Sequence, residues 1–312
     1  MQEDAASTES SGPRSTSRLP RSEIAWAGWR MPVGEDWRPF KIEGGQARGS
    51  MMIGNGEQPI VRVQWSRAKE GDRFDAPAWI EKRLKKIGAV PGANAPCPAS
   101  LDRAAWVRDL ATKGGTTRTI WYGYSAAARL MLELIVTSLT AEALRRDVFK
   151  SLVPRLKVSP PEAPSYWSVY GVGFACPVGF KLKQRHLYSG DIALRFEREK
   201  TSLLLRQVYP AGLAVSRRSA SRWLRVGPFK ERRRMRKAQN GPWRHASRKL
   251  EGVTQQGWKR LPPPLGFAAP RYSTAVAATD TALDRLLIAE LQTRRPGDAA
   301  TVAWAIERMN RG

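Results

Sequence analysis

The sequence predicts an α+β protein made of two similar units, each an antiparallel β-sheet with packed helices, after a disordered N-terminal tail. Two observations predict this architecture. Residues 129–137 resemble residues 285–293, an offset of 156 positions, and residues 29–34 resemble residues 174–179. Each half also contains runs of strand-like sequence, one internal helical run and one terminal helical run. We therefore divide the chain into a disordered tail (1–22), a first α+β unit (23–158), a proline-rich linker (159–165) and a second α+β unit (166–312).

The composition indicates a folded protein with an excess of positive charge. Of 312 residues, 42% are hydrophobic and 12 are tryptophan, which is enough for substantial cores. Lys and Arg number 53 against 28 acids, so the formal net charge is +25. This charge favours anionic partners such as nucleic acid, acidic proteins or lipid surfaces, although a generally Arg-rich proteome also explains it.

The N-terminal tail is rich in Ser, Thr and Arg and lacks an apolar run, which indicates disorder and argues against a secretory signal peptide. The longest apolar run, residues 134–139, is too short for a transmembrane helix. Two isolated cysteines suit a reducing compartment. We expect a cytoplasmic protein.

The first unit begins with structure near residues 24–31. Residues 60–65 alternate, with Val61, Val63 and Trp65 on one face, and predict a half-buried strand. Asp75 is a helix cap with Pro77 in the first turn, and the helix ends at Gly88. Further strands are expected at 105–110, 117–124 and 129–136, and a second helix runs from Thr140 to Pro154.

The second unit restarts the pattern after the linker. Strands are predicted at 192–197 and 203–209, and a helix at 219–224 matches the first helix of the first unit. A basic insertion at about 225–249 interrupts the repeat. Strands near 266–276 and 284–293 follow, and the last helix follows residues 296–298, with Val302, Ile306 and Met309 on one face.

This pattern resembles the PsbP/Mog1-type sandwich, in which a Pro-x-Gly-aromatic turn follows a short opening strand. The matching residues are 177–180 (Pro-Val-Gly-Phe) and, less closely, 32–34 (Pro-Val-Gly) followed by Trp37. The resemblance covers about residues 24–157 and 166–310. It implies tandem copies of a fold whose members mostly act as non-enzymatic accessory or binding proteins.

The basic insertion belongs to a longer cationic segment, residues 213–260, in which fifteen bases and two acids give a local charge of +13. So few nearby acids cannot pair all these bases, and each guanidinium offers a planar fork of donors suited to phosphate. The candidate anion-binding residues are Arg217, Arg218, Arg222, Arg225, Lys230, Arg232, Arg233, Arg234, Arg236, Lys237, Arg244, Arg248 and Lys249.

Two other interpretations of this segment remain. A solvated loop or helix face neutralised by counterions needs no ligand, and docking to anionic lipid would need a larger apolar face than Phe229 and Met235 provide. Trp243 and Trp258 lie beside bases and could stack on nucleobases, but we favour rings that anchor strands.

The sequence contains no recognisable catalytic, metal or cofactor site. His186 and His245 lack partners at metal-ligand spacing. Cys97 is expected in an exposed loop and Cys176 in the core. Glu197, Glu199, Asp191 and Asp284 are more simply solvated strand-edge residues than an acid–base pair.

We therefore predict a non-enzymatic protein that binds RNA or DNA through phosphates, with little sequence specificity and no cofactor. The alternative is an assembly subunit that binds an acidic protein through its duplicated units. A weaker third hypothesis is an enzyme with a site between the repeats that contains Asp191, His186 or Tyr188.

Overall fold

The computed structural model describes residues 22–69, 75–112, 115–137, 139–225, 227–229, 236–245, 249–259, 271–294 and 298–310. Residues 1–21 of the predicted disordered tail lie outside this part of the chain, and Ser22 already belongs to a strand. Of the described residues, 52% are in strands and 18% in helices, and the strands form three antiparallel sheets. The protein is mostly β, so the predicted α+β class with helices packed on each sheet is wrong.

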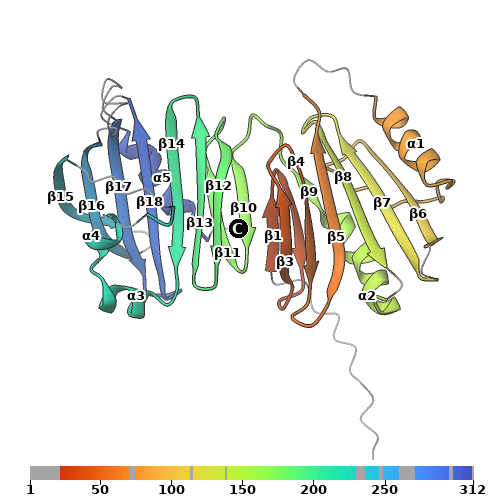
Figure 1. Ribbon diagram of the computed structural model, residues 1–312, viewed down its shortest axis with the longest axis horizontal. Helices are drawn as coiled ribbons and strands as arrows, with labels where there is room; N and C mark the ends of the chain where they lie inside the picture. The colour runs from red at the N-terminus through yellow and green to blue at the C-terminus, as the bar shows by residue number, and fades with distance from the viewer. Residues whose placement is uncertain are drawn as a thin grey trace, which may run out of the picture.

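A small five-stranded sheet lies at the centre of the molecule and takes strands from both halves of the sequence (Figure 1). Its central pair joins the first half to the second at Ala25 and Ser168. In spatial order its strands are β11 (Val172–Cys176), β10 (Ser165–Val169), β1 (Ser22–Trp26), β2 (Trp29–Val33) and β9 (Lys157–Val158).

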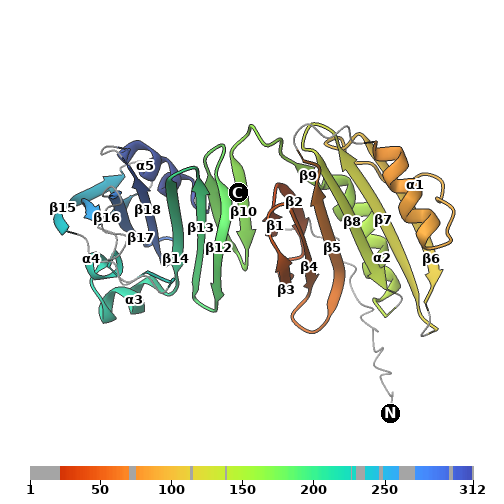
Figure 2. The same ribbon diagram turned by 45° about the horizontal axis from the view of Figure 1, so that its top comes forward.

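The two larger sheets lie on either side of it (Figures 1 and 2). The six-stranded sheet has the order β3 (Arg38–Gly44), β4 (Arg48–Gly54), β5 (Pro59–Arg67), β8 (Leu130–Thr137), β7 (Thr117–Ser125) and β6 (Arg103–Ala111). The seven-stranded sheet has the order β12 (Lys181–Tyr188), β13 (Asp191–Arg198), β14 (Thr201–Val208), β18 (Arg285–Thr293), β17 (Arg271–Asp280), β16 (Leu250–Lys259) and β15 (Arg236–His245).

Five short α-helices occur in the described ranges: α1 (Ala76–Lys86), α2 (Glu142–Asp147), α3 (Ala211–Arg217), α4 (Ala220–Trp223) and α5 (Ala299–Arg308). The predicted start of α1 is confirmed, because the Asp75 carboxylate accepts a hydrogen bond from the Ala78 amide at 3.0 Å. The helix predicted from Thr140 is only six residues of α-helix, followed by a π turn (Val148–Leu152) and a 3₁₀ turn (Val153–Arg155).

One continuous hydrophobic core runs between the small sheet and the inner faces of both large sheets. Aromatic rings connect its parts: Trp26 meets Trp167 edge-on at 5.0 Å, and Trp167 meets Phe196 at 5.4 Å. On the side of the first repeat, Trp29 lies 6.2 Å from Trp65. The two halves therefore share buried surface instead of each closing its own core.

The two large sheets repeat the same strand order, with β15 added at the outer edge of the second. Equivalent turns show the offset: Arg129 and Asp284 both have left-handed φ values of 49°, so the offset here is 284 minus 129, or 155. The offset of 156 predicted from sequence is one residue too long. Side chains alternate between the two faces of a strand. An offset of 156 would therefore align Leu130, which lies in the shared core, with Leu286, which lies on the opposite face of its sheet.

The sequence-based prediction missed strands where they are polar. β15 occupies residues 236–245 of the predicted basic insertion, and β16 follows it. Neither strand was predicted, because charged side chains hide the period-two hydrophobic pattern. β3 was missed for the same reason, since most of its side chains are exposed. The helix predicted at 219–224 is four residues long, as α4. These strands account for part of the excess of β-structure over the prediction, and β4 and β12 were not predicted either.

No helix in the described part of the chain has both the length and the apolar character needed to cross a bilayer.

Candidate nucleic-acid interface

The face of the seven-stranded sheet that points away from the shared core carries α3 and α4 (Figure 2). The small side chains of Ala211 and Ala214 let α3 lie close to Leu286 of β18. Asp284 fixes the start of this helix, since its carbonyl oxygen accepts from the Ala211 amide at 2.8 Å and its carboxylate from the Gly212 amide at 3.1 Å. Asp284, predicted to be a solvated strand-edge residue, therefore positions the segment that carries the first predicted arginines.

Trp223 of α4 ties α4 to α3 and to the sheet. Its indole Nε1 donates a hydrogen bond to the Ala214 carbonyl oxygen at 3.0 Å. The guanidinium of Arg206, from β14, lies 4.8 Å from the centre of the Trp223 ring, and that of Arg218 lies 5.4 Å from it. Cation–π contacts of this kind contribute about 0.5–2 kcal/mol. One tryptophan thus links the helices to a strand below them.

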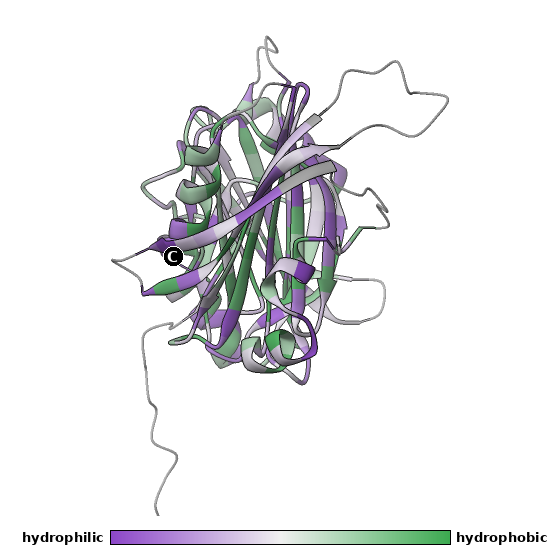
Figure 3. Ribbon diagram, turned by 90° about the vertical axis from the view of Figure 1, so that its left-hand side faces the viewer, coloured by the Kyte–Doolittle hydropathy of each residue, from purple (hydrophilic) through white to green (hydrophobic). Residues whose placement is uncertain are grey.

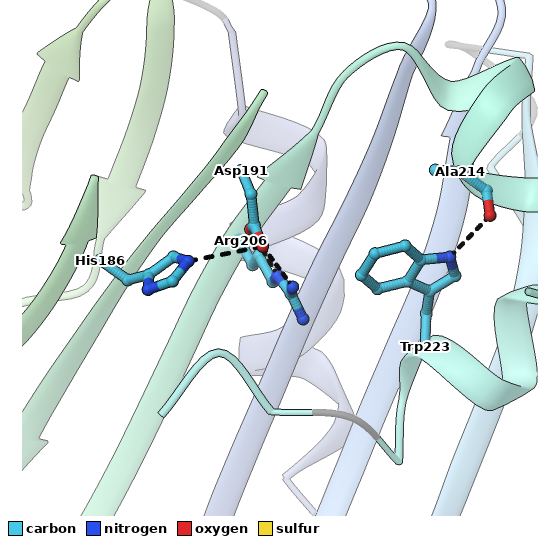
Figure 4. Close-up of polar contacts among 5 residues, drawn as sticks. All are labelled: His186, Asp191, Arg206, Ala214 and Trp223. Atoms are coloured by element: carbon cyan, nitrogen blue, oxygen red, sulfur yellow. Dashed lines mark hydrogen bonds and ion pairs between the residues drawn. The ribbon is translucent and has the colours of Figure 1, made fainter. Parts of the chain in front are cut away.

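Arg206 is in turn held by Asp191 of β13 (Figure 4). Arg206 Nε donates to Asp191 Oδ1 at 2.7 Å, and its Nη2 donates to Oδ2 at 2.5 Å. His186 Nε2 lies 3.5 Å from the same Oδ2. Arg206 is only 4% exposed, so this two-bond pairing compensates a buried charge. Asp191 is not the solvated strand-edge residue expected from the sequence.

The chain returns to this face at Phe229, next to the predicted arginine run. The Arg195 guanidinium lies 4.6 Å from the Phe229 ring centre, and the His186 ring lies 6.3 Å away, edge-on. Lys230, Arg232, Arg233 and Arg234 follow and lie outside the described residues. Within the described residues, the cationic segment is therefore attached to the sheet at Trp223, at Phe229 and again along β15.

The remaining predicted residues are distributed over these elements. The side chains of Arg217, Arg218, Arg222, Arg225, Arg244 and Lys249 are all exposed. Arg236 and Lys237 contribute backbone to β15, with side chains outside the described part, and Arg248 lies outside it altogether. The structure thus describes six of the predicted side chains.

Strand register places Arg244 on the same side of the sheet as α4. Pro242 pairs with Val253, and Val253 packs with Trp223 in the cluster beneath α4. Arg244, two residues after Pro242, therefore points to that side as well. α4 itself lies over β16 and β17. Figure 3 looks onto this end of the molecule, where much of the edge strand is hydrophilic. Arg222 and Arg244 consequently lie on one side of the sheet, together with Arg217, Arg218 and Arg225 on or directly after α3 and α4. We call the surface formed by these five arginines the cationic face.

Most described cations of this face lack an acidic partner. In the described part of the chain no ion pair involves Arg217, Arg218, Arg222 or Arg225. Arg244 lies 3.6 Å from Glu251, and both side chains are more than 70% exposed, so this pair contributes little. The positive charge is therefore available to an external anion.

Trp243 lies on the opposite side of β15 from Arg244 and packs against the shared core. The expectation that its ring anchors a strand is thus confirmed. Cys97 is exposed and Cys176 is buried, as predicted, and both are free thiols. Burial raises the pKa of the Cys176 thiol above its ordinary value. In the described ranges, no group of three or more His, Cys, Asp or Glu side chains could hold a metal ion.

Sequence reasoning missed the polar row beneath the cationic face. Arg195, Arg206, Gln255 and Glu290 are all buried there, and Ser273 Oγ donates to Glu290 Oε1 at 2.6 Å. The signal was present, because polar residues alternate with apolar ones along β13 and β18. An alternating pattern usually indicates a strand with one buried and one solvated face, whereas β13 and β18 are covered on both faces.

Comparison with known proteins gives no further constraint: no protein-family model matches the chain, and no curated protein matches it significantly. The resemblance to PsbP/Mog1 proteins stays a prediction.

Proposed function

We propose that the protein binds RNA or DNA through the cationic face and acts by binding, without catalysing a reaction. The observation that carries this proposal is the set of exposed arginines on and directly after α3 and α4, namely Arg217, Arg218, Arg222 and Arg225, which form no ion pair within the described residues. They stand on elements fixed to one sheet, and Arg244 of β15, only weakly paired with Glu251, adds a further cation. Guanidinium groups suit phosphate oxygens, and a fixed array loses less side-chain and backbone entropy on binding than a loop would.

The proposed binding is dominated by phosphates. The described arginines lie on a surface, and no base-reading motif accompanies them. We accordingly propose low sequence specificity and no cofactor. The proposed compartment is the cytoplasm, which fits two free cysteines.

The test replaces three exposed bases of the cationic face together: Arg222→Gln, Arg225→Gln and Arg244→Gln. Fluorescence anisotropy with a labelled 20-nucleotide RNA should show weaker binding at every salt concentration. The slope of log affinity against log salt should also become shallower by about 0.7–0.9 for each phosphate that the variant no longer neutralises. The fold should be unchanged, because all three side chains are exposed.

A matched control separates the cationic face from net charge. Lys82, Lys85 and Lys86 are exposed on α1, at the far end of the molecule (Figure 1). Changing these three to Gln removes the same charge and should leave the salt slope unchanged. Equal losses of affinity in both triple variants would show that only net charge matters. Retention of a protein partner from nuclease-treated lysate, abolished in the first variant alone, would favour an acidic protein instead.

A further inference from the structure

A groove of about 860 Å³ lies where the two repeats meet, and none of its lining residues belongs to the cationic face. The end of β5, the turns after β3 and β7, residues 159–163 and the start of β12 line it. Its charged lining residues are Arg48, Arg67, Lys69, Arg129, Lys181 and Glu162. Five bases thus face one carboxylate among the described residues, in a volume typical of small-molecule sites.

Arg67 lies in this groove as a half-buried cation with neutral partners. Its Nη1 donates to the Ala128 carbonyl oxygen at 2.8 Å and its Nη2 to the Ala27 carbonyl oxygen at 3.0 Å. Its Nε is buried without a hydrogen-bond partner. Burial lowers the pKa of this guanidinium, and Glu162 acts in the opposite direction without forming an ion pair within the described part. A buried charge without a counter-charge is costly, and an anion in the groove would offset that cost.

The backbone around Arg67 is adapted to this position. Gly28 has a φ of 90°, and a Cβ there would overlap with Arg67 Nη2. Only glycine therefore allows the guanidinium to lie against the β1–β2 turn. The remaining cations surround it from both repeats: Arg48 and Lys181 are exposed, and Arg129 is half-buried.

We propose that this groove is a binding site for a small polyanion, a compact oxyanion with two or more negative charges. Arg67 provides the half-buried cation, and Arg48 from the first repeat and Lys181 from the second contact the ligand from the rim. Guanidinium forks bind phosphate and carboxylate oxygens alike, so the class includes organic phosphates and polycarboxylates.

A second pocket, about 540 Å³, occupies the equivalent place in the other repeat and provides an internal comparison. Arg285 there donates from Nη1 to the Gly171 carbonyl oxygen at 2.8 Å, much as Arg67 donates to Ala27. Arg38 lines this second pocket from the opposite repeat. It corresponds to Lys181 of the groove, because the two are 143 positions apart, the same offset that relates Gly28 to Gly171. The exposed rings of Tyr170, Tyr188 and Tyr209 replace the extra bases in this pocket. The second pocket therefore should bind polyanions more weakly.

Isothermal titration calorimetry of the full chain with pyrophosphate and with citrate, at constant ionic strength, tests the proposal. We expect saturable binding of at least one probe, and the preferred probe identifies phosphate or carboxylate chemistry. Arg48→Gln with Lys181→Gln should weaken binding by about tenfold or more. Glu162→Gln should strengthen it, because it removes the opposing carboxylate.

The matched control changes Arg62→Gln and Lys183→Gln, two exposed bases that line neither the groove nor the second pocket. Affinity for the preferred probe should stay within about twofold. The absence of saturable binding for both probes, or equal losses of affinity in the two double variants, would overturn the proposal. The site is independent of the cationic face, so Arg222→Gln, Arg225→Gln and Arg244→Gln together should leave pyrophosphate binding intact.

Discussion

Asp191 shows how a single carboxylate supports a surface that it does not reach. It pairs with buried Arg206, whose guanidinium lies against Trp223, and Trp223 holds α4 (Figure 4). Each contact alone contributes little, but removing the carboxylate takes the bidentate counter-charge away from a buried guanidinium. The sequence places Asp191 at the start of a strand, where an exposed acid would be equally acceptable.

We expect Asp191→Asn to lower the free energy of unfolding by about 3 kcal/mol, because Arg206 loses its counter-charge in a buried setting. Urea unfolding at neutral pH measures this. Glu197→Gln is the control, since Glu197 is exposed on the same strand and its replacement should change stability by less than about 0.5 kcal/mol. Similar small effects in both variants would mean that Asp191 does not stabilise Arg206.

At the scale of elements, α3 and α4 are too short to be stable alone and depend on contacts with the sheet. Trp223 supplies the contact that joins them, with Val253 and Leu224 in the same cluster. The positions of Arg217, Arg218, Arg222 and Arg225 therefore depend on one indole ring.

Trp223→Leu should loosen both helices while the sheet remains folded. We expect faster amide hydrogen exchange across residues 211–223 and a several-fold loss of RNA affinity, since removing the hydrogen bond and the cation–π contacts costs about 1–3 kcal/mol. Trp304→Leu is the control, because Trp304 has a similar arginine contact, with Arg308 at 4.6 Å, on α5. RNA affinity that survives Trp223→Leu would show that these helices are not part of the interface.

Some elements could be predicted from sequence and others could not. The start of α1 has local signals, Asp75 and Pro77, and the structure confirms it. The repeat was visible, but its register was not, because aligned leucines on opposite faces look alike in sequence. The groove around Arg67 had no local signal, since residues 28, 67, 129 and 181 meet only after folding.

At the scale of the whole molecule, hydrogen bonds join the two repeats beyond the small sheet. Arg185 of β12 donates to the carbonyl oxygens of Gly44 at 2.8 Å and Ile42 at 2.9 Å in β3. Tyr170 donates from its hydroxyl to the Pro39 carbonyl oxygen at 3.0 Å. With the shared core, these contacts make each repeat dependent on the other.

The whole chain should therefore unfold in one cooperative transition. Far-UV circular dichroism and tryptophan fluorescence should give the same urea midpoint, and Asp191→Asn in the second repeat should also increase hydrogen exchange in β5 and β8 of the first. Two separate transitions, or protection in β5 and β8 that is unaffected by the variant, would show that the repeats fold independently.

The pairing of β1 with β10 has a consequence for how the molecule can approach other molecules. Two identical chains related by a rotation axis would present every surface twice, whereas a covalent tandem lets the copies diverge. Here the extra strand β15 and its arginines occur at one end only. The two ends of the molecule therefore differ, and an acidic polymer bound at the cationic face would contact one end and leave the opposite end facing outward.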